Sequence, residues 1–248
     1  MKKMTNNSEK TVLVTGASRG IGKSIAELLI QEGYNVFISA KNQKRLQDTA
    51  KEIGAAGFFS LDLCCANAES LAEFFAITGN IDILVNNAGD YVYSPIEKTS
   101  DEDMRRLLSL NIEAPFMLIR SVVPHMKNQK WGRIVNIGSI SGVVGEANAS
   151  LYSLTKSAFL GLTKSLALEL AQDNITINTI NPGWVDTELA KDAVEESTFS
   201  YEEELDMIPQ RRFICPEEIA HLVKYMISQE AKGMTGQSVN LCAGLSVG

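Results

Sequence analysis

Short apolar runs rich in β-branched residues alternate with helical stretches along the whole chain, and no other feature restricts its fold as strongly. The expected strands cover residues 11–15, 35–39, 57–61, 81–85, 133–137, 175–180 and 238–241. The expected helices cover residues 21–31, 43–53, 68–76, 101–127, 151–171 and 216–228. Apolar strands that alternate with helices form parallel βαβ units with helices on both faces of the sheet. The pattern predicts an α/β fold with a doubly wound parallel sheet of about seven strands.

The composition is that of a globular protein, with 45% apolar and 21% charged residues among 248. Its 23 basic and 30 acidic side chains leave a net charge of −7, which argues against nucleic acid or an anionic membrane as a partner. No apolar run approaches the ~18 residues of a membrane span, and no signal peptide is apparent. Four cysteines without metal-ligand spacing indicate reduced thiols and no metal site, so we expect a cytoplasmic protein. No linker, repeat or break in composition divides residues 1–248, which are predicted to form one domain.

A glycine-rich turn, "VTGASRGIG", joins the first expected strand to the first expected helix. Its glycines are Gly16, Gly20 and Gly22, where the chain must turn sharply and bring its backbone close to a phosphate. The helix that follows directs free N–H groups and a positive dipole end toward the same point. An ordinary glycine-rich turn is the alternative, but three glycines at this junction favour a dinucleotide site.

The end of the second expected strand indicates which dinucleotide binds there. NAD-binding folds place an acidic residue at this point to bind the adenosine ribose hydroxyls. Here the stretch is "ISAKN", residues 38–42, without an acid, whereas Lys41 and Arg19 supply cations for a 2′-phosphate. The alternative is that both cations face solvent, as most do. The pattern favours NADP(H), with NAD(H) as the alternative.

Tyr152 and Lys156 lie four residues apart in "YSLTK", so they share one face of a helix. A free phenol has a pKa of about 10, and an ammonium beside it stabilises the phenolate and lowers that pKa. Ser139, thirteen residues before Tyr152, follows the fifth strand and would hydrogen-bond a substrate oxygen. We expect Tyr152 to protonate a carbonyl as the general acid. The alternatives are surface positions for Tyr152 and Lys156 and a capping role for Ser139.

Several motifs fall at the ends of strands: "DILVNNAG" (residues 82–89), "IVNIGSISG" (134–142) and "NPGWVDT" (181–187). With the glycine-rich turn and "YSLTK", they make the sequence resemble the short-chain dehydrogenase/reductase family over nearly its whole length. The resemblance implies a Rossmann-type fold, a ribose contact for Lys156, a helix kink and proton relay for Asn111, an adenine contact for Asp62 and a carboxamide contact for Thr187. It implies the catalytic residues Asn111, Ser139, Tyr152 and Lys156. The implied cofactor-binding residues are Gly16, Ser18, Arg19, Gly20, Ile21, Gly22, Lys41, Asp62, Leu63, Asn87, Ala88, Gly89, Tyr152, Lys156, Pro182, Gly183, Val185 and Thr187.

Within that family, "QRRFICPEEIAHLV" (residues 210–223) and "GMTGQSVNL" (233–241) are similar to 3-oxoacyl-carrier-protein reductases. The resemblance implies reduction of a ketone to a secondary alcohol. Ala243 stands where these reductases usually have the second glycine of a terminal pair. The segment between Asp62 and Asn86 is about two residues shorter than in these reductases, so the third expected helix is less certain to form. Asp173 occupies a place where such reductases carry a basic residue for the acidic carrier protein, leaving Lys130 as one basic contact. Both an acyl thioester and a small free ketone remain candidate substrates.

Two further readings concern the class of protein. The resemblance also admits an NAD-dependent alcohol dehydrogenase of the same family. It admits a non-catalytic NADP-sensing protein too, although such members have lost part of the catalytic set that this chain retains. Turnover of ketones with NADPH would separate an enzyme from a sensor.

Residues 184–208 break the alternation of strands and helices, and carry nine acidic residues with few apolar ones. A solvated acidic segment is one reading, and a lid over the substrate site is the reading that we favour. Aromatic residues that could line the pocket are Tyr91, Tyr93, Trp184 and Phe199.

The expected helices 101–127 and 151–171 correspond to those that pair between family subunits, so the resemblance implies a homotetramer or a homodimer. Their apolar residues could instead pack only on the sheet. These residues are Leu107, Leu108, Phe116, Leu118, Phe159, Leu162 and Leu166.

Overall fold

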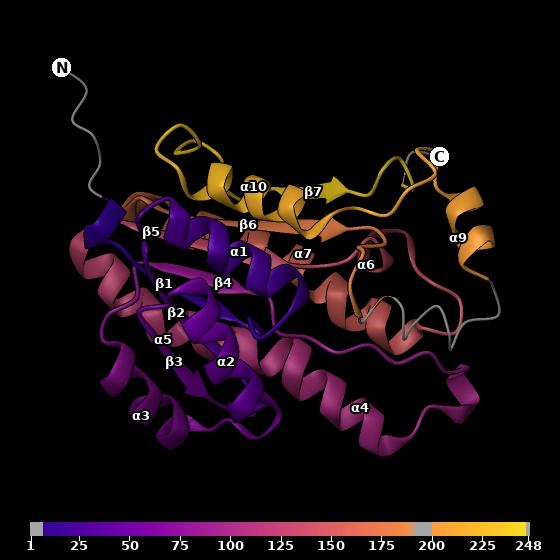
Figure 1. Ribbon diagram of the computed structural model, residues 1–248, viewed down its shortest axis with the longest axis horizontal. Coiled ribbons are helices and arrows are strands. Elements are labelled where there is room, and N and C mark those ends of the chain that lie inside the picture. The colour runs from indigo at the N-terminus through magenta and orange to yellow at the C-terminus, as the bar shows by residue number, and fades with distance from the viewer. Residues whose placement is uncertain (1–6, 189, 191–199, 247–248) are drawn as a thin grey trace.

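A single parallel sheet of seven strands, in the order β3-β2-β1-β4-β5-β6-β7, organises the computed structural model, which describes residues 7–188, 190 and 200–246 (Figure 1). The strands are β1 (Thr11–Thr15), β2 (Asn35–Ala40), β3 (Gly57–Ser60), β4 (Ile83–Asn86), β5 (Gly132–Ile137), β6 (Ile175–Pro182) and β7 (Ser238–Leu241). The principal helices are α1 (Gly20–Gln31), α2 (Gln43–Ile53), α3 (Ala68–Thr78), α4 (Asp101–Leu108), α5 (Ala114–Gln129), α6 (Ser141–Val144), α7 (Ser150–Leu170), α9 (Tyr201–Met207) and α10 (Pro216–Ile227). The predicted doubly wound α/β fold is confirmed.

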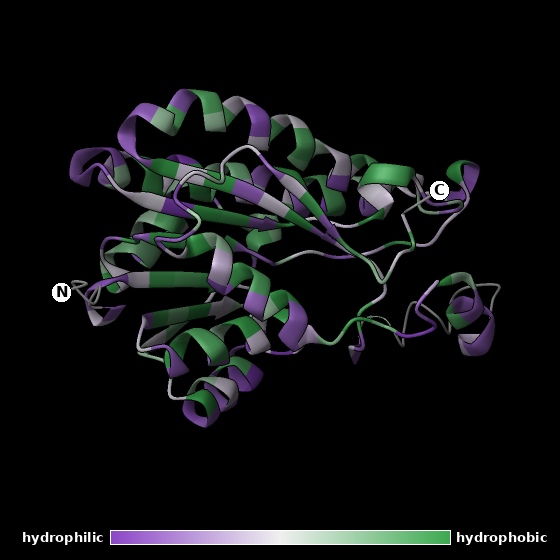
Figure 2. Cartoon of the chain, turned by 90° about the horizontal axis from the view of Figure 1, so that it is seen from above, coloured by the Kyte–Doolittle hydropathy of each residue, from purple (hydrophilic) through white to green (hydrophobic). Residues whose placement is uncertain are grey.

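Neighbouring residues of each central strand enter different hydrophobic cores, because side chains alternate across a sheet. In β1, Val12 and Val14 pack with helices α1, α2 and α10, whereas Leu13 packs with α3, α5 and α7. Figure 2 shows hydrophobic residues along the strands and hydrophilic ones on the outer parts of the helices. Helices therefore cover both faces of the sheet, as the near-continuous apolar strands require.

The strand order reverses direction between β1 and β4, so the connections after these strands leave toward opposite faces. In an open α/β sheet, the crevice at the carboxyl ends of strands beside such a switch point is where ligands bind. The glycine-rich turn after β1 and the segment after β4 both lie at this edge. The motifs of the sequence are thereby brought to one side of the molecule.

The expected helix over residues 101–127 is interrupted by a turn of π-helix, Ser109–Glu113, between α4 and α5. By length and composition alone the whole stretch Asp101–Gln129 could cross a membrane. In the fold, Leu118, Ile119 and Val122 of this stretch are buried in the core formed with α3 and α7. Packing on the sheet therefore accounts for part of its apolar character, since 39% of the apolar window is buried.

Helices form in two regions where the sequence left the structure open, the shortened segment after Asp62 and the acidic segment 184–208. Helix α3 forms despite its shortened surroundings, and begins with a capping box between Asn67 and Ser70. In the acidic region, Ser200 and Glu203 form the capping box of α9. Glu204 of that helix is buried rather than solvated, with 5% exposure. Part of the expected lid, residues 189 and 191–199 including Phe199, lies outside the described residues.

Candidate active site

The glycine-rich turn is held against the segment that follows β4. Gly16 has a φ of +64°, and a Cβ there would lie 2.8 Å from the Ala88 Cα atom. A Cβ on Gly22 would lie 2.5 Å from Asn87 Nδ2. That Nδ2 atom donates to the carbonyl oxygens of Thr15 and Gly16 at 2.9 and 3.2 Å. Glycine is therefore required here for close approach of two backbones, as the sequence pattern indicated.

Thr15, which the sequence reading did not single out, connects the same two segments. Its Oγ1 atom accepts hydrogen bonds from the backbone N–H groups of Asn87 and Ala88, both at 3.0 Å. Thr187 lies on the outer side of the turn, where its Cγ2 atom would be 3.3 Å from a Cβ on Gly20. The N-cap residue of α1, Arg19, makes no side-chain capping bond, so its side chain leaves the first turn of the helix open. The backbone N–H groups at the start of α1 are therefore available to bind an anion.

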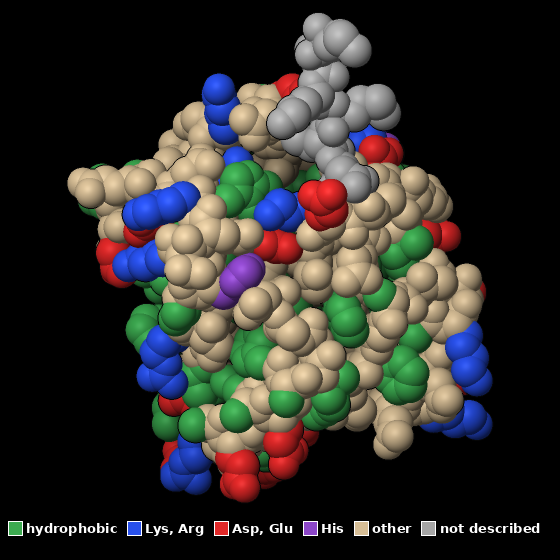
Figure 3. Space-filling view, turned by 90° about the vertical axis from the view of Figure 1, so that its left-hand side faces the viewer, with side chains coloured by type: hydrophobic (Ala, Val, Ile, Leu, Met, Phe, Trp, Pro, Cys, Tyr) green, Lys and Arg blue, Asp and Glu red, His purple; other side chains and the backbone are tan. Residues whose placement is uncertain are grey.

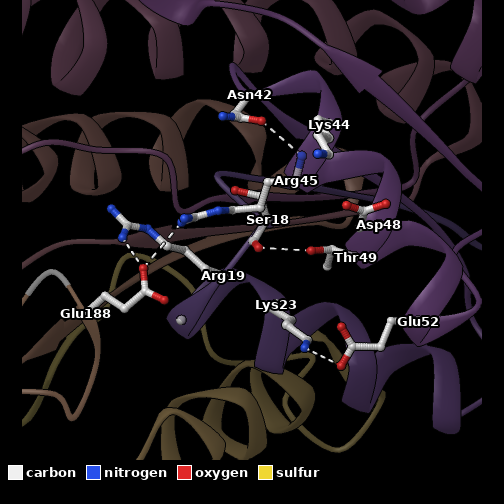
Figure 4. A pocket seen from close by; sticks show the side chains of 11 residues that line it. Ser18, Arg19, Lys23, Asn42, Lys44, Arg45, Asp48, Thr49, Glu52 and Glu188 are labelled. Atoms are coloured by element: carbon white, nitrogen blue, oxygen red, sulfur yellow. Dashed lines mark hydrogen bonds and ion pairs between the residues drawn. The ribbon is translucent and has the colours of Figure 1, made fainter.

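A cavity of about 640 Å³ extends from the start of α1 to the start of α2 (Figure 4). Four basic residues line it, Arg19, Lys23, Lys44 and Arg45, together with three acidic ones and the polar Ser18 and Asn42. Asn42 Oδ1 accepts from the Arg45 N–H at 2.9 Å and so caps α2. This arrangement positions a basic residue from each helix at one cavity.

Glu188 occupies the mouth of this cavity and pairs with both arginines: directly with Arg19, and with Arg45 Nη1 at 3.3 Å (Figure 4). The Arg19 guanidinium, with a smaller contribution from Arg45, lowers the pKa of the Glu188 carboxyl group. A carboxylate between two guanidinium groups shows that this place favours an anion.

Three of the residues expected to bind cofactor have other visible roles. Lys41 is exposed and does not line the cavity, although its carbonyl oxygen accepts from Ser60 Oγ at 3.0 Å. The exposed Asp62 caps a short 3-10 helix, accepting from the Cys64 N–H at 3.0 Å. Leu63 is buried in the core. Sequence reasoning missed Asn42, Lys44 and Arg45, since their contribution depends on how α2 is oriented.

Ser139, Tyr152 and Lys156 come together where β5 ends and α7 begins. Ser139 and Lys156 are buried, with 9% and 5% exposure, and Ser139 is hydrogen-bonded to Tyr152. Lys156 Nζ lies 5.6 Å from the centre of the Tyr152 ring and donates to the Ile137 carbonyl oxygen at 3.0 Å. The spacing in the sequence therefore correctly placed a serine, a phenol and an amine in one cluster.

Asn111 lies in the π-helical turn, with 1% exposure. Its Nδ2 atom donates to the Asp90 carbonyl oxygen and to Thr155 Oγ1, each at 3.0 Å. Its Oδ1 atom accepts from the Asp90 N–H at 3.1 Å. The extra residue in the turn thus directs the amide toward the segment after β4 and toward α7, and Asn111 joins these two walls of the site.

Burial sets the proton affinities of the two catalytic candidates. It raises the pKa of Tyr152 to about 12, while the hydrogen bond with Ser139 opposes the rise and the Glu146 charge adds to it. Burial also lowers the pKa of Lys156 to about 8. The expected net fall in the pKa of Tyr152 is not found in this structure, because the loss of hydration outweighs any stabilisation by the Lys156 ammonium, which hydrogen-bonds to Ile137. The phenol therefore keeps its proton at neutral pH.

A chain of hydrogen bonds leads from Ser139 to an acid that the sequence reading missed. Ser139 Oγ donates to Ser141 Oγ at 3.1 Å, and Ser141 Oγ donates to Glu146 Oε2 at 2.6 Å. The Tyr91 hydroxyl donates to Glu146 Oε1, also at 2.6 Å. The Tyr91 and Tyr152 rings meet edge to face, with centroids 4.9 Å apart. The only acid between Ser139 and Tyr152 in the sequence was the signal that could have revealed Glu146.

The other expected pocket aromatics have different partners. Trp184 stacks on Phe213 with ring centroids 5.7 Å apart, and Tyr201 of α9 contacts the same ring at 4.9 Å. The Tyr93 hydroxyl accepts from Asn148 Nδ2 at 2.9 Å. Thus the structure places Tyr91 beside Tyr152, while Trp184 anchors the segment that carries α9.

Lys130 and two further cations that could attract an acidic carrier, Arg211 and Arg212, are each paired with an acid. The pairs are Lys130 with Asp173, Arg211 with Asp206, and Arg212 with Glu218. On the described part of the face at the N-terminal ends of the strands, basic side chains lie beside acidic ones (Figure 3). The described residues therefore offer local ion pairs at these three positions rather than unopposed positive charge.

A glycine turn suited to a phosphate, an adjacent cavity lined by four basic residues, and a Ser–Tyr–Lys cluster at the same sheet edge are typical of a nucleotide-binding oxidoreductase. The sequence model described as "short chain dehydrogenase" matches residues 10–198. The chain belongs to the short-chain dehydrogenase family.

The chain is similar to several known proteins along almost its whole length. The 3-oxoacyl-[acyl-carrier-protein] reductase FabG of Buchnera aphidicola is 36% identical over 240 residues, covering 96% of this chain and 97% of the relative. The uncharacterized oxidoreductase YxjF of Bacillus subtilis is 35% identical over 251 residues, covering 95% and 98%.

Two solved structures are also similar. A 3-oxoacyl (acyl-carrier-protein) reductase from Agrobacterium tumefaciens with NADP bound has a TM-score of 0.89 at 29% identity, covering 98% of both chains. A variant of actinorhodin polyketide ketoreductase with NADPH has a TM-score of 0.90 at 32% identity, covering 97% of this chain and 99% of that one.

Proposed function

We propose that this protein is an NADPH-dependent reductase that converts a ketone to a secondary alcohol. The observation that carries the proposal is the cluster of the half-buried Tyr152 with the buried Ser139 and Lys156, which lies near a turn suited to a pyrophosphate. The proposed direction is the reductive one, in which the protonated Tyr152 phenol gives up its proton.

The residues fit a dinucleotide cofactor. A Cβ on Gly89 would lie 3.2 Å from Lys156 Nζ and 3.3 Å from Asn111 Oδ1, so glycine leaves the space between the turn and the catalytic cluster open. The turn from Gly16 to Gly22 would hold the pyrophosphate, and Lys156 would hold the nicotinamide ribose. When bound, the cofactor supplies the hydride that reduces the carbonyl carbon.

Tyr152 would donate its phenolic proton to the carbonyl oxygen as negative charge develops there. Ser139 would turn its hydroxyl proton from Ser141 to the same oxygen and so fix the position of the carbonyl. Lys156, with a pKa lowered to about 8, is still largely protonated at neutral pH and would stabilise the phenolate left after transfer. Asn111 holds the walls of this site together through Asp90 and Thr155.

Charge at the end of β2 supports NADPH over NADH. Residues 38–42 contain no acid, and Arg19 and Arg45 line the adjacent cavity. Both guanidinium groups already bind a carboxylate, Glu188, and a 2′-phosphate would replace it as their partner. Two similar structures carry NADP or NADPH, which agrees with this choice.

The substrate is proposed to be a free ketone or simple thioester rather than one presented by a carrier protein. Similarity to a 3-oxoacyl-[acyl-carrier-protein] reductase supports 3-oxoacyl compounds as one candidate substrate class. However, Lys130, Arg211 and Arg212 are each neutralised by an acid, and the net charge is −7. An acidic carrier would therefore meet little steering attraction.

The direct experiment follows NADPH oxidation with a panel of ketones, including a 3-oxoacyl substrate both free and on a carrier protein. We expect turnover of at least one free ketone and less than a tenfold preference for the carrier form. NADPH binding without turnover of any ketone would contradict the reductase function and favour a sensor. A hundredfold carrier preference that weakens with added salt would show that steering by basic residues dominates.

A further inference from the structure

The catalytic serine is connected to a carboxylate that the chemistry described above does not use. Ser139 bonds to Ser141, and Ser141 donates to Glu146 at 2.6 Å. Tyr91, whose ring contacts Tyr152, donates to the other carboxylate oxygen at 2.6 Å. Glu146 follows Gly145, whose φ of +81° turns the chain after the short helix α6. The loop thus brings its carboxylate back toward the reacting centre.

The charge of Glu146 affects the pKa values of three other groups in this part of the protein. It contributes to the raised pKa values of Tyr91, Tyr152 and Glu204, after burial in each case. Glu204 is itself buried in α9 and hydrogen-bonded to Trp184. Among the ion pairs of the described residues, no Lys or Arg is paired with Glu146. The carboxylate therefore has no cation in the described part of the protein to neutralise it.

Glu146 also has capacity for another donor. An ionised carboxylate offers about four lone-pair sites, and Ser141 and Tyr91 use one on each oxygen. The side chain is only half-buried, and its partner Tyr91 contacts the ring of Tyr152, which places the carboxylate near the substrate side. Two short bonds hold it in a fixed orientation, which is what recognition of a substrate group requires.

We propose that Glu146 selects the substrate, accepting a hydrogen bond from a hydroxyl or protonated amino group near the ketone and disfavouring ketones that carry a carboxylate there. The site would then take hydroxy- or aminoketones in preference to keto acids. This inference rests on the proposed reductase function. A role for Glu146 only in positioning Ser139 through Ser141 is the competing explanation, and it predicts equal losses for all substrates.

The test compares three ketones of similar size: aminoacetone, hydroxyacetone and pyruvate. The values of kcat/KM with NADPH are measured for the wild type, Glu146→Gln and the control Glu217→Gln, an exposed glutamate at the start of α10. Glutamine keeps the shape and one acceptor but removes the charge. The wild type should prefer aminoacetone to pyruvate, and Glu146→Gln should reduce that preference by about ten- to hundredfold, the effect of one charge-assisted hydrogen bond. Hydroxyacetone should be affected less, and Glu217→Gln should leave the preference unchanged.

Dividing the two rates within each variant removes any general damage to the site, and comparing this ratio between variants removes the intrinsic reactivity of the ketones. An unchanged ratio with uniformly lower rates would show that Glu146 only positions Ser139, and would overturn the inference. Wild-type protein that reduces pyruvate as well as aminoacetone, or reduces other panel ketones but none of these three, would overturn it as well. Those results would leave the reductase function standing, whereas no turnover of any ketone would remove the function itself.

Discussion

Gly142→Ala tests whether the packing of α6 on α7 positions the catalytic pair. A Cβ at Gly142 would lie 2.6 Å from the Lys156 carbonyl carbon and 2.8 Å from the Ser157 nitrogen. Favourable contacts between carbon atoms need about 3.5–4.0 Å, so α7 must move by roughly 1 Å. Overpacking of this kind costs about 1–3 kcal/mol, which lowers Tm by about 2–12 °C in a chain of this size.

The same shift displaces the helix that carries Tyr152 and Lys156. A misplacement of about 1 Å can lower kcat by roughly a hundredfold. Thermal unfolding and steady-state ketone reduction measure the two effects in one preparation. Gly161→Ala in the same helix is the matched control, because a Cβ there meets nothing within 4 Å. It should raise stability by up to ~1 kcal/mol and leave kcat unchanged. Wild-type kcat and Tm in Gly142→Ala would refute the reasoning.

Three further predictions concern the cofactor, the pH profile and assembly. Ala40→Asp should lower the ratio of kcat/KM for NADPH to that for NADH at least tenfold, because a carboxylate at the end of β2 repels a 2′-phosphate; equal use of both cofactors by the wild type would count against this. The kcat/KM for reduction should fall above pH ~8 as Lys156, whose pKa burial lowers to about 8, loses its charge; a profile that stays flat to pH ~10 would contradict it. Light scattering should give a homo-oligomer, a tetramer if the family resemblance holds, because the apolar Phe116 of α5 and Leu168 of α7 are 50% and 84% exposed; a monomer mass would exclude association.

The sequence predicted the fold well because the information is local. Seven apolar strands and the helices between them can be recognised by their periods, and βαβ connections then determine a parallel sheet. Tyr152 and Lys156 were found for the same reason, since four residues on one helix place both on one face. Helix α3 formed because its Asn67 cap and apolar face survive the shortening of the segment.

The sequence could not reveal features that depend on tertiary arrangement. Arg45 reaches the cavity near Arg19 only because of where α2 packs. The pKa of Tyr152 rises because of burial, which the spacing to Lys156 does not report. The π-helical turn at Asn111 adds one residue to a helical period; apolar residues on both sides hide that insertion, so only the family resemblance indicated a kink there. Glu146 comes to the site through a glycine turn whose direction the sequence does not specify.

The most direct test of the central claim is hydride transfer by Tyr152→Phe, measured alongside NADPH binding. Phenylalanine keeps the ring that contacts Tyr91 and removes only the hydroxyl that carries the proton. We predict that kcat/KM for ketone reduction falls by about 10²–10⁴, while the Kd for NADPH in a fluorescence titration stays within about twofold of the wild type. Unchanged cofactor binding together with more than ~1% of wild-type turnover would show that the proton comes from another group.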